Sequence, residues 1–351
     1  MRPDGSPALA PGQSLRSRRD ILKIAAAATV APALAGGVRA LAPQGKLYDW
    51  RLEVMGASSE LALWHHDPVA ANRAIDQVRS EVARLDGVFS LYRSDSEISR
   101  LNHDGFLDNP SCELRNLLNA GQQFSELSGG AFDISVQPLW ELYAAHFWQG
   151  VDTSADIEAA AQRVAERLVD YRLIDIGKHR IRLKRPGMGV TLNSIGQGFV
   201  ADRIADMLSG HGFTHVYADL GEIRLIGDHP EGRPWRIGLR DPSDQSNFGR
   251  MLDLENIGLA VTGGYATPFE ETGRHNHIFN PRTGLSADKM AAIAVTAPSA
   301  MIANGIATSI YVAGREHAAK ILGAYPGAKA VITTAAGEWL GSRADVGFAA
   351  I

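Results

Sequence analysis

A glycine motif in the middle of the chain has the composition of a phosphate-binding segment. Gly196-Gln197-Gly198 follows an apolar stretch and opens a segment with helical spacing. Glycines at the start of a helix let backbone N–H groups approach a phosphate. The motif also fits the degenerate fingerprint of dinucleotide-binding proteins, because Asp219 follows about twenty residues later. The pattern beyond Asp219 is typical of antiparallel hairpins, so we predict a turn that binds another phosphate rather than a nicotinamide cofactor.

The elements that must position this motif follow from the spacing of apolar residues. Intervals of three and four residues predict helices, of which the one before Gly129-Gly130 has a glycine stop signal. The helices are expected at 74–89, 114–127, 153–170 (capped by Thr153 or Ser154), 199–209, 299–312 and 316–325. Alternation predicts hairpins over 46–66 and 330–340 and strands at 180–184, 189–192, 215–220, 223–226, 235–240, 259–261, 277–279 and 292–296. Strands in neighbouring runs with single helices between them favour an α+β fold over a doubly wound sheet.

The first 42 residues have the pattern of an export signal. Arg18 and Arg19 precede a weakly apolar run over 24–34, and small residues at 38–42 provide a cleavage site. Paired arginines before such a run are typical of twin-arginine export. We therefore expect a signal peptide at 1–42, a mature domain at 43–351, and a periplasmic protein without stable membrane insertion after cleavage. The alternative is a signal that stays uncut and anchors the protein in the inner membrane, facing the periplasm.

Composition narrows the class of protein further. The chain has 351 residues, 45% hydrophobic and 21% charged, as ordinary globular proteins do. Removing residues 1–42 leaves 29 basic and 37 acidic residues, a net charge of −8, which argues against nucleic acid as a partner. The single cysteine, Cys112, excludes an intrachain disulfide framework and multi-cysteine metal sites.

Eight short segments, in the same order along the chain, resemble the ApbE family of FAD:protein FMN transferases. They extend over roughly residues 50–345, nearly the whole mature chain. The segments are Met55-Gly56, Leu91-Tyr92-Arg93, Ser128-Gly129-Gly130-Ala131-Phe132-Asp133, Ser194-Ile195-Gly196-Gln197-Gly198, Asp219-Leu220-Gly221-Glu222-Ile223-Arg224, Pro234-Trp235, His277-Ile278-Phe279-Asn280-Pro281-Arg282-Thr283-Gly284 and Ala297-Pro298-Ser299-Ala300-Met301. The twin-arginine signal and the two glycine variants look most similar to the NosX-like branch that accompanies nitrous oxide reductase.

The resemblance implies a fold and a reaction. The fold is α+β with a T-fold-like portion. The reaction is the Mg²⁺-dependent transfer of FMN from FAD to a Ser or Thr hydroxyl of another protein, with release of AMP. The acceptor would be a flavoprotein of a membrane electron-transfer system. Breaking a pyrophosphate requires neutralised phosphate charge, and the acceptor hydroxyl requires a base, for which His277, Asp133, Asp219 and Glu222 are candidates.

The resemblance also implies roles for individual residues. It assigns catalysis to His277 and Asp133; the alternative for Asp133 is that it merely caps a loop, and the resemblance favours flavin binding. The expected FAD contacts are Met55, Tyr92, Ala131, Phe132, Asp133, Thr191, Gln197 and His277.

The predicted Mg²⁺ ligands are Ser194, Asn304 and Thr308. The interval of four places Asn304 and Thr308 on one helical face. Asn304 stands where the family usually has Asp, so the site keeps its geometry and loses one negative charge. Two alternatives remain open at this point: an FAD-binding assembly factor weakened in catalysis, and a Mg²⁺-dependent FAD pyrophosphatase that uses water as acceptor.

Overall fold

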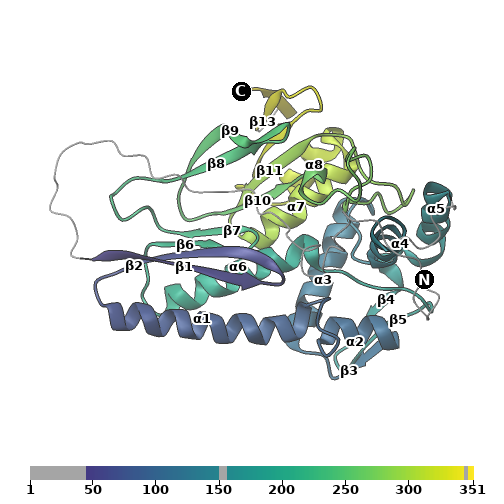
Figure 1. Ribbon diagram of the computed structural model, residues 1–351, viewed down its shortest axis with the longest axis horizontal. Coiled ribbons are helices and arrows are strands. Elements are labelled where there is room, and N and C mark those ends of the chain that lie inside the picture. Colours follow the sequence, from purple (N-terminus) through teal and green to yellow (C-terminus); the bar gives the residue numbers. More distant parts are fainter. Residues whose placement is uncertain (1–44, 150–155, 344–346) are drawn as a thin grey trace, which may run out of the picture.

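The fold is built on one large antiparallel sheet (Figure 1). The structure is a computed structural model that describes residues 45–149, 156–343 and 347–351. The predicted signal peptide at 1–42 lies outside these residues. Nine strands pair in the order β1-β2-β6-β7-β10-β11-β12-β13-β14, and each neighbouring pair is antiparallel. Their bounds are β1 Lys46–Val54, β2 Ala57–His65, β6 Val216–Asp219, β7 Ile223–Ile226, β10 Gly258–Thr262, β11 Ala292–Ala297, β12 Lys329–Thr333, β13 Trp339–Arg343 and β14 Gly347–Ala350.

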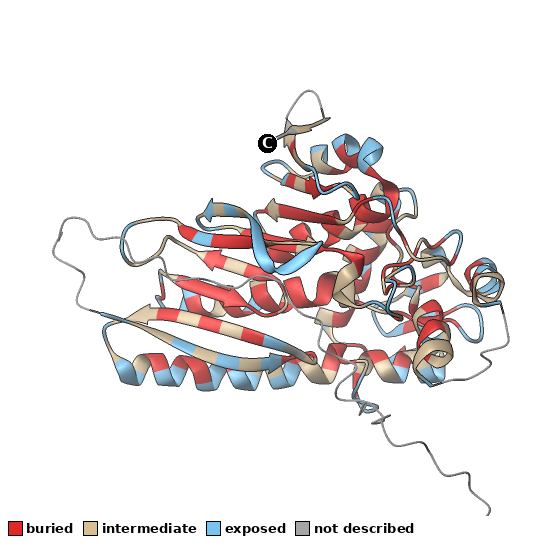
Figure 2. Ribbon diagram, turned by 45° about the horizontal axis from the view of Figure 1, so that its top comes forward, coloured by how far each residue is buried: buried red, intermediate tan, exposed pale blue. Residues whose placement is uncertain are grey.

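Helices cover one face of this sheet and bury the main core. Side chains on alternate positions of β6, such as Val216 and Ala218, pack with those of α1, α3, α6 and α7. Figure 2 shows buried positions along the central strands and on α6 and α7, whereas α1 keeps an exposed outer face. The helices are α1 Pro68–Phe89, α3 Cys112–Leu127, α6 Asn193–Gly210, α7 Ala300–Ala313 and α8 Ala318–Gly323.

A two-stranded ribbon covers part of the opposite face. Strands β8 Trp235–Asp241 and β9 Asp244–Leu254 pair with each other. Trp235, Ile237 and Leu239 of β8 pack on Tyr217 and Leu225, which point away from the main core. The alternation of Val216 with Tyr217 therefore divides strand β6 between two apolar layers.

Two smaller units flank the sheet. The first is a three-stranded sheet in the order β3-β5-β4, with bounds β3 Phe106–Asp108, β4 Ile174–Ile176 and β5 Arg180–Leu183, next to α2 Glu97–Asp104. The second joins α4 Gln137–Trp148 and α5 Ile157–Leu168 to the long loop between β10 and β11 through an aromatic cluster. Within it, Tyr143 donates to the carbonyl of Gly284 and Trp148 to that of Phe269.

The α+β class and most predicted elements are confirmed, with four local corrections. Residues 189–192 are not a strand, because Gly189 makes only an isolated bridge to Val136 and α6 begins at Asn193. The segment 277–279 is loop, held by main-chain bonds from the neighbouring turns. Helix α5 is capped by Asp156, whose carboxylate accepts from two N–H groups, while Thr153 and Ser154 lie outside the described residues. Helices α2 and α4 and strands β3, β4, β9 and β14 were not predicted. Within the described residues, no helix is long and apolar enough to cross a membrane.

Candidate active site

A cavity opens where the β6–β7 turn meets the start of α6, the middle of α7 and the long loop before β11. Its walls combine aromatic rings with a few polar groups, the usual composition of a site for a planar organic molecule. The aromatic residues in the lining are Tyr92, Phe132, Trp140, Trp148, Tyr265 and Phe279.

The glycine motif lies inside the first turns of α6 instead of in a turn before it. The N–H of Gly196 already donates to the carbonyl of Leu192 at 2.6 Å, so it is not free for a phosphate. A Cβ on Gly198 would lie 2.6 Å from the carbonyl oxygen of Ala300. The expectation of a phosphate-binding glycine turn is therefore corrected: at Gly198 the small residue allows α6 and α7 to pack closely.

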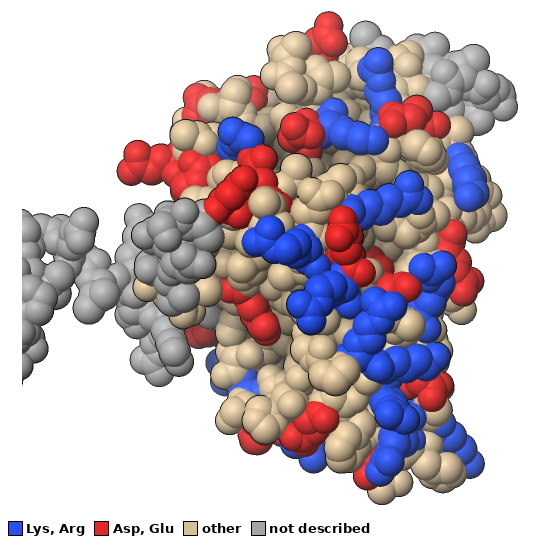
Figure 3. Space-filling view, turned by 90° about the vertical axis from the view of Figure 1, so that its right-hand side faces the viewer, with Lys and Arg blue, Asp and Glu red and all other residues tan. Residues whose placement is uncertain are grey.

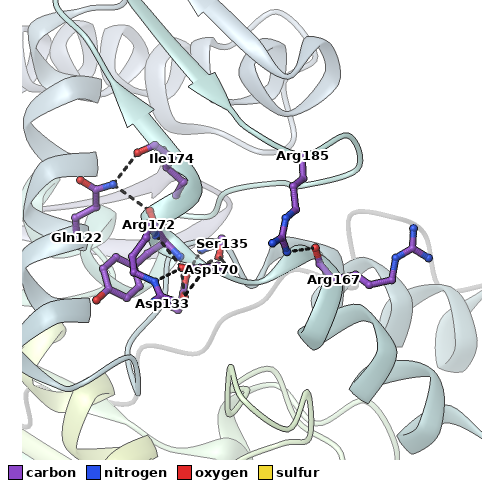
Figure 4. Close-up of polar contacts among 9 residues, drawn as sticks. Gln122, Asp133, Ser135, Arg167, Asp170, Arg172, Ile174 and Arg185 are labelled. Atoms are coloured by element: carbon purple, nitrogen blue, oxygen red, sulfur yellow. Dashed lines mark hydrogen bonds and ion pairs between the residues drawn. The ribbon is translucent and has the colours of Figure 1, made fainter.

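Asp133 holds a loop at the edge of the cavity (Figure 4). Its Oδ1 accepts from the N–H of Ser135 at 2.8 Å and from the Ser135 hydroxyl at 2.6 Å. Its Oδ2 accepts from the N–H of Tyr171 at 3.1 Å. Burial raises the pKa of this carboxyl, while the three donors act in the opposite direction. Both oxygens thus tie the wall of the cavity to the β4 region, as the loop-capping alternative predicts.

His277 has a ring nitrogen that is buried and has no partner. Its Nδ1 lacks a hydrogen bond, and the hydroxyl of Thr267, which also lines the cavity, lacks one as well. Burial lowers the pKa of His277 to about 4. The imidazole is therefore neutral at physiological pH and can accept a proton from a nearby hydroxyl.

Two buried carboxyl groups and a buried amide also line the cavity. Asn304 on α7 donates from Nδ2 to Oε1 of Glu222 at 2.6 Å. Asp219 ends β6, and Glu222 lies three residues further on, in the turn to β7. Burial raises the pKa of Asp219 to about 7. Burial, with Asp219 nearby, raises the pKa of Glu222 well above its usual range.

Partnerless polar atoms concentrate in this cavity. Within the described ranges, six buried side-chain nitrogen or oxygen atoms lack a hydrogen bond. Four of them belong to cavity-lining residues: Asp219, Thr267, His277 and Asn304. Buried polar groups without partners are costly, and they occur preferentially at sites that bind a ligand.

The structure brings together nearly all of the residues predicted for the site. Those that line the cavity are Tyr92, Ala131, Phe132, Asp133, Thr191, Ser194, Gln197, His277, Asn304 and Thr308. Met55 is the exception, because it is 7% exposed and packs in the core with its methyl group near Gly196. The ligand roles of these residues, including flavin contact by Met55, stay predictions.

Sequence reasoning missed the contribution of α4. Trp140 and Trp148 reach the cavity from this helix, which the sequence pattern did not reveal because its apolar residues lie all around it. Thr267 was missed as well, since nothing local distinguishes it from other loop threonines. The proline at the start of α4, Pro138, is the one helix-start signal that this segment offered.

A basic surface lies around strands β4 and β5, which follow Tyr171, the residue that bonds to Asp133. Figure 3 shows Lys and Arg side chains gathered on the side of the molecule that carries β4 and β5. Arg182 and Lys184 are exposed there, along a groove that Arg185 also lines. Arg180 is paired with Asp108, and Arg172 with Asp170, whose neighbour Tyr171 bonds to Asp133.

Comparison with known proteins agrees with this architecture. The ApbE family pattern matches residues 55–332. The FAD:protein FMN transferase of Haemophilus influenzae is 27% identical over 304 residues, covering 83% of this chain and 88% of the relative. The enzyme of that name from Vibrio cholerae is 29% identical over 250 residues, covering 69% and 73%.

Solved structures share the fold. "Flavin Transferase ApbE from Vibrio cholerae" superposes with a TM-score of 0.71 at 22% identity, covering 88% of this chain and 97% of that one. The apo form of the Pseudomonas stutzeri flavinyl transferase ApbE gives 0.68 at 26% identity, covering 88% and 94%. The matched span of 55–332 includes the residues that line the cavity. The chain therefore belongs to the ApbE family.

Proposed function

We propose that this protein is an FAD:protein FMN transferase. One observation carries the proposal: of the six buried side-chain polar atoms that lack a hydrogen bond in the described residues, four lie in a cavity lined by aromatic rings. The rings suit the flat apolar ring system of a flavin, and the polar atoms suit the charged end of the molecule. Relatives that carry this enzyme name match most of the chain and support the same reaction.

The reaction requires one bond to form and one to break. The oxygen of an acceptor Ser or Thr attacks the phosphorus of the FMN half of FAD, and AMP leaves with the bridging oxygen. The proton of the hydroxyl must pass to a base. His277 fits this role because its ring is neutral and its Nδ1 has no partner. Asp133 fits a positioning role instead, because both of its oxygens hold the loop.

The polar wall also fits Mg²⁺. Asn304 Oδ1 and Asp219 Oδ1 are buried oxygens without partners, and the hydroxyls of Thr308 and Ser194 lie in the same lining. Hard oxygen donors of this kind are those that Mg²⁺ prefers. When bound, the ion would neutralise charge on the phosphates as the pyrophosphate bond breaks.

The setting of the reaction is part of the same proposal. The acceptor would be a flavoprotein of a membrane electron-transfer system, in the periplasm, as for the NosX-like branch. The pattern at 1–42 supports twin-arginine export. Replacing Arg18 and Arg19 by Lys should leave the precursor in the cytoplasm; normal periplasmic accumulation would contradict this route.

The test is to incubate the pure mature protein with FAD, Mg²⁺ and a candidate acceptor and to measure the mass of the acceptor. We expect a gain of one FMN, which should disappear when the acceptor's Ser or Thr is changed to Ala. Release of free FMN without a mass gain would indicate a pyrophosphatase. Bound FAD without turnover, with any acceptor tried, would indicate an assembly factor.

A further inference from the structure

The hydrogen bond between Asn304 and Glu222 fixes the orientation of the Asn304 amide group. The two residues are 4% and 8% exposed, and Asn304 Nδ2 lies 2.6 Å from Glu222 Oε1. The donor atom of this hydrogen bond is the amide Nδ2, so the NH₂ end of the amide faces Glu222. The carbonyl end, Oδ1, is then directed elsewhere, and it is buried without a partner in the wall of the cavity.

The carboxyl groups in this wall have no cationic side chain that would stabilise their charged form. Glu222 and Asp219 are both buried, and Asp219 Oδ1 also lacks a partner. Among the described residues that line the cavity, none is Lys or Arg. Buried carboxylates persist when they are protonated, paired or bound to a metal ion. A diphosphate entering this cavity would add further negative charge, which a divalent cation would offset together with that of the carboxylates.

We propose that Glu222 supplies the negatively charged ligand of a divalent-cation site in this chain, with Asn304 contributing its neutral Oδ1. Thr308, one helical turn after Asn304, adds a hydroxyl from the same face of α7. The proposal rests on the proposed function and deepens it, because it moves the charged ligand from helix α7 to the β6–β7 turn. It also revises the ligand set expected from the sequence, which contained no carboxylate.

Because Glu222 and Asn304 are in contact, a carboxylate and an amide can be exchanged between these two positions. Asn304→Asp alone would place two buried carboxylates in contact, whereas Glu222→Gln alone would remove the charge. The double variant Glu222→Gln, Asn304→Asp restores one carboxylate and one amide with the hydrogen bond reversed. A cation site built on this pair should therefore survive the exchange and fail in the Glu222→Gln single variant.

The experiment measures Mn²⁺ binding to the full mature protein by electron paramagnetic resonance, without FAD or acceptor. Glu222→Gln should weaken Mn²⁺ binding about tenfold or more, because one negative charge is lost in a buried site. The double variant should return to within about threefold of the wild type. Glu338→Gln is the matched control: Glu338 is an exposed residue in the β12–β13 turn and does not line the cavity, so binding should not change.

Thermal unfolding with and without Mg²⁺ tests whether the variants are folded. Glu222→Gln should keep a cooperative transition and lose the rise in Tm that Mg²⁺ produces in the wild type. The proposal is overturned if Glu222→Gln binds Mn²⁺ as the wild type does, if Glu338→Gln weakens binding equally, or if the exchange restores nothing. Mn²⁺ binding that depends on Glu222, without any transfer of FMN, would refute the proposed function and leave the cation site standing.

Discussion

At the scale of single residues, the site is defined by polar atoms whose partners the protein does not supply. Asn304 Oδ1, Asp219 Oδ1 and His277 Nδ1 are buried in the cavity without hydrogen bonds. Asp133 is the contrast, because its carboxylate is satisfied by three donors from its own loop and from Tyr171. The atoms without hydrogen bonds are available to a ligand, whereas the Asp133 carboxylate positions a loop at the edge of the cavity.

Asp133→Ala should destabilise the protein and weaken FAD binding together. The change leaves the N–H groups of Ser135 and Tyr171 without an acceptor, a loss of about 3 kcal/mol in the free energy of unfolding. Denaturant unfolding and FAD titration measure the two effects. Asp175→Ala, an exposed carboxylate on β4, is the control and should change neither quantity. An Asp133→Ala protein with wild-type stability would mean that the loop is held by other contacts.

His277 should make the stability of the protein depend on pH in a defined window. Burial lowers its pKa from 6.5 to about 4 in the folded chain, so between these values the unfolded chain binds more protons. The free energy of unfolding should therefore rise as the pH rises from about 4 to about 6.5. His277→Gln should flatten this part of the profile, measured by urea unfolding at a series of pH values. His179→Gln, on an exposed histidine in the β4–β5 turn, should leave the slope unchanged.

At the scale of elements, helices α6 and α7 place the polar groups by packing against each other. Asp202 of α6 accepts from the N–H groups of Ala300 and Met301 and from the hydroxyl of Ser299, so it caps α7. Gly198 permits the close approach of the two helices. This packing explains why Asn304 and Thr308 line the same cavity as Ser194, although they are far apart in the sequence.

Gly198→Ala should disturb this packing. The added methyl group would meet the carbonyl of Ala300 at 2.6 Å, where only a shift of α7 relieves the overlap. We expect a loss of about 2 kcal/mol in stability and weaker FAD binding, because α7 carries Asn304 and Thr308. Gly210→Ala, at the end of the same helix with no heavy atom within 4 Å, should be neutral or stabilising. Equal effects of the two substitutions in thermal unfolding would show that close helix packing is not the reason for Gly198.

At the scale of the whole molecule, charge is distributed unevenly over an acidic protein. The basic groove lined by Arg182 and Lys184 lies on β5, which pairs with β4, and β4 follows Tyr171, the residue that bonds to Asp133 at the edge of the cavity. An attractive surface beside an active site accelerates encounter with an oppositely charged partner.

Arg182→Glu should raise the KM for the protein acceptor about fivefold and leave FAD affinity unchanged. The effect should fade as salt increases, because exposed charges are screened. Arg236→Glu, an exposed strand arginine on β8 at another surface, is the matched control and should not alter KM. The KM for the acceptor is measured from steady-state transfer kinetics at two salt concentrations. An unchanged KM in Arg182→Glu would show that the groove does not contribute to acceptor recognition.

Much of this protein could be determined from its sequence because the relevant signals are local. The periodicities of 74–89, 114–127 and 299–312 appear as α1, α3 and α7, since an amphipathic helix needs only its own spacing and a core to face. The interval of four between Asn304 and Thr308 likewise placed both residues in the cavity. Helix α4 escaped detection because its apolar residues surround it, which leaves no periodic contrast.

Only the tertiary structure decided what the nonlocal contacts do. The spacing of Gly196 and Gly198 is the same for a phosphate turn and for a tight helix crossing, and the position of Ala300 selects the second. Whether Asp133 meets a ligand or a loop depends on Tyr171, 38 residues away. The partner of Asn304 is Glu222, 82 residues away, so the location of negative charge in the site depends on how the β6–β7 turn meets α7. Side-chain type and interval are properties of a segment, whereas hydrogen-bond partners and burial arise only when distant segments pack.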